Sequence, residues 1–62
     1  MENTAYVPLL TVTQLARMLN VKPSWVYGKV ASQEIPHVHV GRYPRFDVAE
    51  IRAWLRKRRG DS

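Results

Sequence analysis

The chain lacks residues and segments that several classes of protein require. It contains no cysteine, which excludes disulfide bonds and thiolate metal sites and fits a reducing compartment. No run approaches the roughly 18 apolar residues of a membrane span. The N-terminus also lacks the basic and then apolar pattern of a signal peptide. The sequence therefore predicts a cytoplasmic protein with no membrane partner.

Acidic residues are scarce as well. The chain has 10 Lys and Arg against 5 Asp and Glu, a net charge of +5. All the basic residues lie between Arg17 and Arg59, where Glu34, Asp47 and Glu50 are the opposing acids. A basic domain of this kind favours a polyanionic partner such as DNA.

Catalysis and metal binding have little support. Without cysteine or a cofactor motif, and with two of the three central acids at predicted helix starts, we expect no enzyme, no catalytic residue and no cofactor. His37 and His39 share one face of a predicted strand, but no third ligand accompanies them. Because zinc sites usually have three or four protein ligands, we expect no metal site.

The length of 62 residues leaves room for one domain with one small core. We expect a tail over residues 1–10, the folded domain over residues 11–59, and a second tail over residues 60–62.

The first predicted helix begins at Thr11, because Thr11 and Gln14 form the Thr-x-x-Gln pattern of a capping box. It ends near Asn20, a residue that tolerates the left-handed conformation. Its apolar residues recur with the period of one helix face, as Val12, Leu15, Ala16 and Leu19.

A second helix is predicted from Pro23 to Ser32, since proline suits the first helical position. The short connection from Asn20 to Pro23 is typical of a helix-turn-helix. We expect Val26, Val30 and Trp25 on its inner side. Gly28 on the outer side costs roughly 1 kcal/mol relative to alanine, so either its backbone approaches something closely or the loss is tolerated.

The period then changes to that of a strand. Residues 37–40 alternate histidine and valine, so the two valines face one side and the two histidines the other. Gly41-Arg42 suits a type II′ hairpin turn, and residues 43–46 return as an edge strand that contains Pro44.

A last helix begins at Asp47, with Glu50 completing a predicted capping box, and ends in the basic run 56–59 before Gly60. Its apolar stripe is Val48, Ile51, Trp54 and Leu55. The predicted fold class is thus mainly α with a small β-hairpin: a winged helix-turn-helix that binds double-stranded DNA through a basic face.

The sequence resembles the excisionase-type, MerR-like winged helix-turn-helix domains over about residues 10–55. The matching residues are Leu10-Thr11, Leu15-Ala16, Leu19-Asn20-Val21, Trp25-Val26-Tyr27, Ile35-Pro36, Val40-Gly41-Arg42 and Ile51-x-x-Trp54-Leu55. The resemblance implies that the second helix enters a major groove and that the wing touches an adjacent minor groove. Excisionases bind repeated sites, bend DNA and direct an integrase towards excision, whereas other relatives are small transcription regulators.

The predicted DNA contacts lie on the second helix and the wing. Arg42 at the hairpin tip is the foremost, because a narrow minor groove attracts arginine, and Arg45 is expected on the outward strand face with His39 pointing the same way. Many relatives carry a basic residue at the position of Gly28, which this chain lacks. The full set is Lys22, Pro23, Ser24, Tyr27, Gly28, Lys29, Arg42, Tyr43 and Arg45.

The partners that follow are double-stranded DNA, further copies of the chain on adjacent sites, and an integrase, in a prokaryotic or phage nucleoid. Three alternatives stay open. The chain is an excisionase, a small transcription regulator, or an adaptor whose basic face binds an acidic protein. The run 56–59 either contacts phosphate or protein, or only complements the helix dipole.

Overall fold

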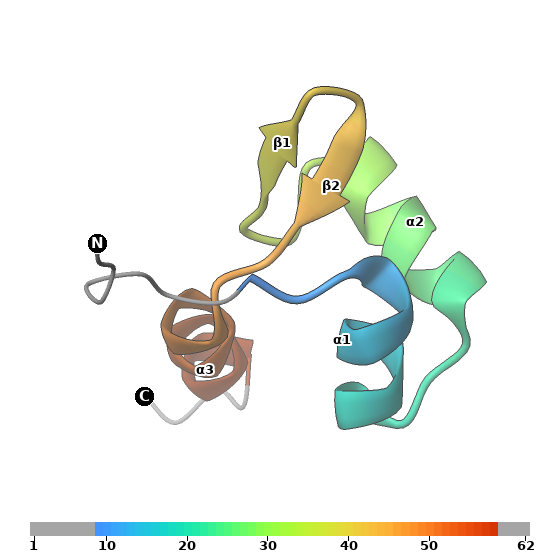
Figure 1. Ribbon diagram of the computed structural model, residues 1–62. Helices are drawn as coiled ribbons and strands as arrows, with labels where there is room; N and C mark the ends of the chain where they lie inside the picture. The colour runs from blue at the N-terminus through green and yellow to red at the C-terminus, as the bar shows by residue number, and fades with distance from the viewer. Residues whose placement is uncertain (1–8, 59–62) are drawn as a thin grey trace.

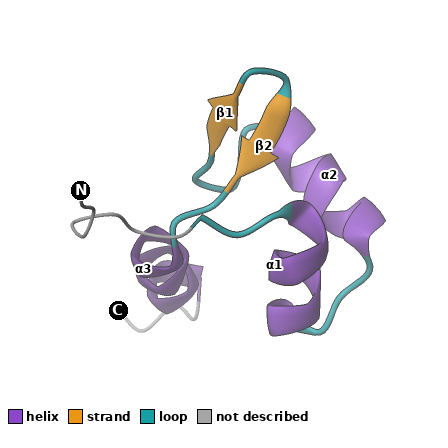
Figure 2. Cartoon of the chain, viewed as in Figure 1, coloured by secondary structure: helices purple, strands orange, loops and turns teal. Residues whose placement is uncertain are grey.

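The computed structural model describes residues 9–58, arranged as two helices, a two-stranded hairpin and a third helix (Figure 1). The order matches the sequence prediction and confirms a mainly α winged helix-turn-helix. The elements are α1 (Val12–Leu19), α2 (Pro23–Ala31), β1 (Val38–Val40), β2 (Tyr43–Arg45) and α3 (Val48–Arg58) (Figure 2).

Helix α1 is capped at its start as predicted. The Gln14 N–H donates to the Thr11 hydroxyl (3.1 Å), and the Thr11 N–H donates to the Gln14 side chain (3.0 Å). The helix ends at Asn20, which adopts the left-handed conformation with φ 61°. The Val21 N–H then bonds back to the Ala16 carbonyl (2.9 Å), which closes the turn tightly enough for α2 to begin at Pro23.

One small core joins all the elements. Each of the three helices contributes one completely buried side chain, namely Leu15 of α1, Val26 of α2 and Ile51 of α3. Phe46, just after β2, is buried with them, and Ile35 of the α2–β1 connection is 2 % exposed. Because these residues come from every part of the fold, the domain can bury its core only as a unit.

Trp25 lies outside this core, contrary to the prediction. Its side chain is 37 % exposed and packs edge-on against Trp54, with ring centroids 6.5 Å apart. The helical period places Trp25 one position from Val26, at the margin of the buried stripe, where a large ring reaches across to α3 rather than inward.

The hairpin has the predicted two-residue turn. Gly41 has φ 65° and Arg42 does not have a positive φ, as a type II′ turn requires. Beyond β2 the chain pairs with the segment before α1. The Leu10 N–H donates to the Phe46 carbonyl (2.8 Å), and the Phe46 N–H donates to the Leu10 carbonyl (3.0 Å). The base of the hairpin is therefore tied to the start of α1.

Helix α3 begins after Asp47, whose carboxylate accepts from the Ala49 N–H (2.8 Å). This bond goes to the second helical residue rather than the third, so the reciprocal box predicted with Glu50 does not form. Helix α3 is followed as far as Arg58; the predicted stop at Gly60 lies outside the described residues. Over residues 9–58, no helix has the length and hydropathy needed to cross a bilayer.

Candidate nucleic-acid interface

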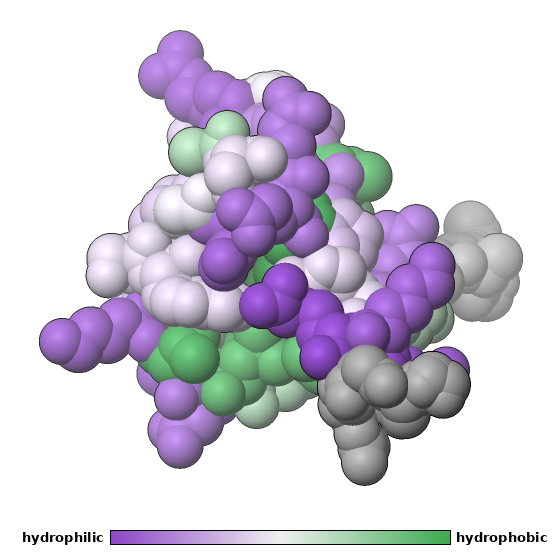
Figure 3. Space-filling view, turned by 180° about the vertical axis from the view of Figure 1, so that it is seen from behind, coloured by the Kyte–Doolittle hydropathy of each residue, from purple (hydrophilic) through white to green (hydrophobic). Residues whose placement is uncertain are grey.

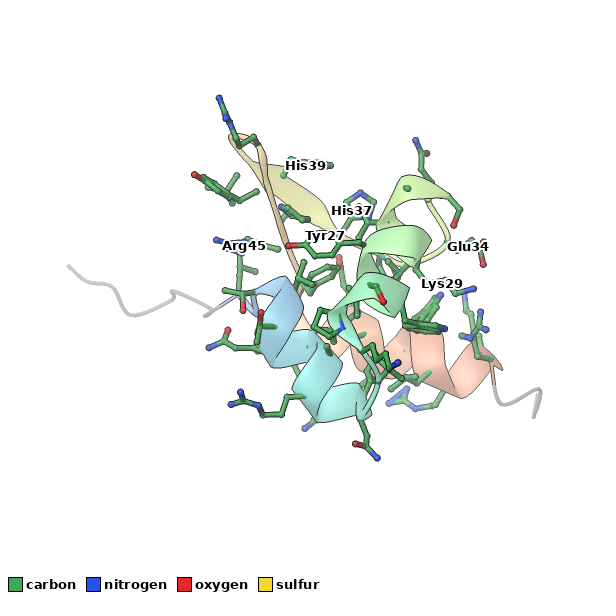
Figure 4. The ribbon with its side chains drawn as sticks, turned by 90° about the vertical axis from the view of Figure 1, so that its right-hand side faces the viewer. Tyr27, Lys29, Glu34, His37, His39 and Arg45 are labelled. Atoms are coloured by element: carbon green, nitrogen blue, oxygen red, sulfur yellow. The ribbon has the colours of Figure 1, made fainter. Side chains whose placement is uncertain are left out.

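The outer face of α2 is free of cover from the rest of the domain. Ser24, Tyr27 and Gly28 are all exposed, and the Tyr27 side chain, 57 % exposed, reaches from α2 toward the hairpin (Figure 4). Side chains near the N-terminal end of a recognition helix are the ones that can reach base edges in a major groove. The structure thus leaves a polar and aromatic face available on α2.

Gly28 has no neighbour that explains its lack of a side chain. A Cβ built on Gly28 would meet nothing within 4 Å, so no packing inside the domain requires glycine there. The sequence left two explanations for this glycine: close approach of the α2 backbone to another group, or tolerance of the lost helix propensity. Since no group within residues 9–58 is that close, the first explanation now requires an external ligand.

The start of α2 adjoins a surface hollow of about 230 Å³. Lys22 and Pro23 are exposed at this end, and no side chain caps the helix. Arg17 and Thr13 of α1 line the hollow opposite Pro23. Arg17 and Thr13 are not among the predicted contacts, although the period of α1 already placed both away from its buried stripe.

The hairpin presents Arg42 at its turn, exposed to solvent. Tyr43 next to it is 58 % exposed. Arg45 is half-buried because its guanidinium lies over the Tyr43 ring, 5.4 Å from the centroid, and donates to the Pro44 carbonyl (2.8 Å). Arg42 is thereby the freest cation of the hairpin, and Arg45 is held in one orientation.

The strand register corrects the predicted direction of His39. Val38 pairs with Arg45, and His39 pairs with Pro44, and partners directly opposite in an antiparallel pair share one face. Val38 and Arg45 therefore lie on one face of the hairpin, and His39 lies on the other. The alternation of valines and histidines is confirmed, but His39 does not point the same way as Arg45.

The face that carries the histidines is built from close ring contacts. His37 and His39 meet edge-on with centroids 5.1 Å apart, and the His37 Nδ1 lies 2.7 Å from the Ile35 carbonyl oxygen. Figure 4 shows both histidines together with Tyr27 between α2 and the hairpin. This inner side of the hairpin carries the two histidines, whereas the outer side carries Tyr43 and Arg45.

Lys29 is directed to another part of the molecule. Its ammonium is 3.1 Å from the Glu34 carboxylate and 5.3 Å from the Trp25 ring centroid. Figure 4 shows the Lys29–Glu34 pair on the side of α2 opposite to Arg45. Of the predicted contacts on α2, Lys29 is the one whose charge is already partnered within the domain.

The sequence predicted one basic face, but the basic residues are not gathered on one face of the structure. Helix α3 carries Arg52, Arg56, Lys57 and Arg58, all exposed, and lies at the end of the molecule remote from the hairpin turn (Figure 1). Seen from behind, hydrophilic side chains also project around a hydrophobic area (Figure 3). Arg59 of the basic run lies outside the described residues.

The predicted contact residues therefore separate into groups. Lys22, Pro23, Ser24, Tyr27 and Gly28 are exposed at the start and on the outer face of α2, and Arg42, Tyr43 and Arg45 lie on the hairpin. Lys29 is directed away from the hairpin, to Glu34 and the Trp25 ring. The arrangement of a short turn, an exposed second helix and a β-hairpin defines the class of winged helix-turn-helix proteins.

The comparisons with known proteins agree with this class. A family model described as "Helix-turn-helix domain" matches residues 9–59, and the chain belongs to this family, which makes it a DNA-binding protein. No curated protein and no solved structure matches it.

Proposed function

We propose that the protein binds double-stranded DNA with the outer face of α2 in a major groove and the hairpin turn at the neighbouring minor groove. The observation that carries this proposal is the placement of Tyr27 and the hairpin on one side of the molecule (Figure 4). A helix and a wing on the same side can contact one duplex together, because adjacent grooves are separated by a single phosphate backbone.

In this proposal, Ser24 and Tyr27 face base edges and Gly28 lets the backbone of α2 approach the duplex. Arg42 enters the minor groove, where negative potential is concentrated. Arg45, fixed against the Tyr43 ring, contacts a phosphate. Lys29 contributes to the domain rather than to DNA, since Glu34 already neutralises its charge.

The hollow beside Pro23 extends the proposed footprint onto α1. Arg17 offers a cation and Thr13 a hydroxyl to a phosphate that follows the edge of the major groove, next to the positive end of α2. These contacts position the domain on the backbone and carry no base sequence.

We further propose that the protein is an excisionase, which binds repeated sites as several copies and bends DNA so that an integrase acts in the direction of excision. The small extent of the surface supports this role. One short helix and one hairpin cover few base pairs, so useful specificity needs neighbouring copies. The resemblance in residues 10–55 supports the same reading.

Substitution of two arginines tests the DNA-binding mode. Arg42→Ala is expected to weaken binding and to reduce the slope of log K against log salt by about 1, the effect of one lost phosphate or groove contact. Arg56→Ala on α3 removes the same charge at the other end of the molecule and is the matched control. Equal losses for both variants would show that bulk charge drives binding and would overturn the proposed orientation.

Gel shifts on DNA beside a neighbouring integrase gene test the excisionase role. Stepwise complexes whose mobility depends on the position of the site in the fragment indicate several copies and a bend. A single complex without bending, and no effect on excision, would contradict this role and favour a small transcription regulator.

A further inference from the structure

The two elements proposed to contact DNA are joined by a short connection, residues 32–37 between α2 and β1. Together with the backbone pairing of Leu10 and Phe46 at the base of the hairpin, its conformation sets the angle between the recognition helix and the hairpin. A change of that angle would move Arg42 away from the duplex while Ser24 and Tyr27 stayed in place. The contacts that fix residues 32–37 therefore help to decide whether both elements reach DNA at once.

The first part of the connection is fixed by the end of α2 itself. Gln33 adopts the left-handed conformation with φ 60°. Its N–H donates to the Val30 carbonyl (3.0 Å), and the Glu34 N–H donates to the Lys29 carbonyl (2.9 Å). This pair of bonds is the Schellman arrangement. The Lys29–Glu34 ion pair closes over it on the surface.

The next contact comes from α3. The indole Nε1–H of Trp54 donates to the backbone carbonyl of Glu34 over 2.7 Å. Across residues 9–58, every other hydrogen bond formed by a side chain joins residues five or fewer positions apart, whereas this one spans 20 positions. It is thus the one long-range side-chain hydrogen bond in the described part of the chain, and it ends on the connection.

The neighbours of Trp54 hold its ring in the orientation that this bond needs. Trp25 of α2 meets the ring edge-on at 6.5 Å. The guanidinium of Arg58 lies over the ring, 4.8 Å from its centroid. The ring is therefore bracketed by α2 on one side and by its own helix on the other, with its N–H aimed at the Glu34 carbonyl.

We propose that Trp54 is a positioning residue for DNA binding. Its indole N–H holds the Glu34 carbonyl and thereby fixes the angle between α2 and the hairpin, so that both contact one duplex. Trp54 itself touches no DNA in this arrangement. The inference rests on the proposed binding mode, in which α2 and the hairpin bind together.

Trp54→Phe tests the role, because phenylalanine keeps an aromatic ring and loses the donor. One side of the ring lines a surface hollow, so the smaller side chain needs no new space. The matched control is Leu55→Val, since Leu55 of the same helix packs against the core. Both variants are measured at a low temperature at which circular dichroism shows them folded.

The readout is a double-mutant cycle with Arg42→Ala. We expect Trp54→Phe to lower DNA affinity about tenfold, because this is the change in affinity that corresponds to the free energy of one lost hydrogen bond. In its background, Arg42→Ala should have little further effect, because the hairpin is no longer held against the groove. Leu55→Val should lower the unfolding temperature and leave both the affinity and the Arg42→Ala effect unchanged.

Three results would overturn the inference. The first is wild-type affinity in Trp54→Phe, and the second is an equal loss of affinity in Leu55→Val. The third is that the Trp54 indole proton exchanges with solvent as fast as that of Trp25, which would show that the hydrogen bond does not persist. This measurement is made on the unaltered chain. Absence of DNA binding by the unaltered chain would instead remove the proposed function on which the inference rests.

Discussion

Replacing Gly28 by alanine is expected to change stability and DNA binding in opposite directions. Gly28 lies inside α2, and a Cβ added there meets nothing within 4 Å. The variant therefore gains helix propensity without a steric cost in the free protein. Glycine in a helix interior costs roughly 0.5–1 kcal/mol relative to alanine. For a domain of this size that gain raises the unfolding temperature by about 2–8 °C.

On DNA the same methyl group meets a ligand surface. If the backbone of α2 approaches the duplex at Gly28, the Cβ must be accommodated by a shift of the helix. Overpacking of this kind typically costs about 1–3 kcal/mol, so the dissociation constant is expected to rise by roughly tenfold or more. The sign difference separates an interface glycine from one that is merely tolerated.

Thermal unfolding and fluorescence titration of labelled DNA measure the two effects. Ala53→Gly is the matched control, because Ala53 is exposed in the interior of α3, away from the proposed interface. It should lower the unfolding temperature and leave DNA affinity unchanged. Unaltered affinity in Gly28→Ala would refute close approach at this position, and a lower unfolding temperature would refute the open space around it.

The remaining predictions concern stability. Gln33→Gly should raise the free energy of unfolding by about 1 kcal/mol, because it relieves a left-handed residue; denaturant titration showing a loss would contradict this. Thr11→Ala should lower it by about 1 kcal/mol through loss of the capping bond to Gln14, and an unchanged midpoint would speak against the cap. The Ser32 hydroxyl, the hydrogen bond from Lys29 and its charge lower the pKa of Glu34. This carboxylate therefore stabilises the fold above its unfolded pKa, and the contribution is lost as the pH falls through the lower, folded pKa. Glu34→Gln should accordingly lower the unfolding temperature at about pH 7 but not in strong acid, and an equal effect at both would exclude an ionic origin.

Most local features, in which a residue acts on its immediate neighbours, could be predicted from the sequence. The capping box at Thr11 and the left-handed Asn20 follow from short-range hydrogen bonding and backbone preference. Gly41 at the turn and Pro23 at the start of α2 follow in the same way. These features fix the order of elements, and the apolar period of α1 identifies its buried face. The sequence could therefore predict the fold class.

Apart from the capping box expected between Asp47 and Glu50, the failed predictions depend on where an element lies relative to others. Whether Trp25 entered the core depended on the distance from α2 to α3, where Trp54 receives it. His39 could be assigned to a face only once the register paired it with Pro44. The DNA contact predicted for Lys29 stays a prediction, and the ion pair that the end of α2 forms between Lys29 and Glu34 is a feature that only the fold revealed.

Composition and periodicity determined that this chain is a basic winged helix-turn-helix protein, because charge and helix patterns are properties of the chain itself. The tertiary structure decided which charges are available to a ligand. It left Arg42 in solvent, engaged Lys29 with Glu34, and set the cations of α3 at the end remote from the hairpin turn. That separation arises from packing three short helices around one small core, which no local pattern encodes.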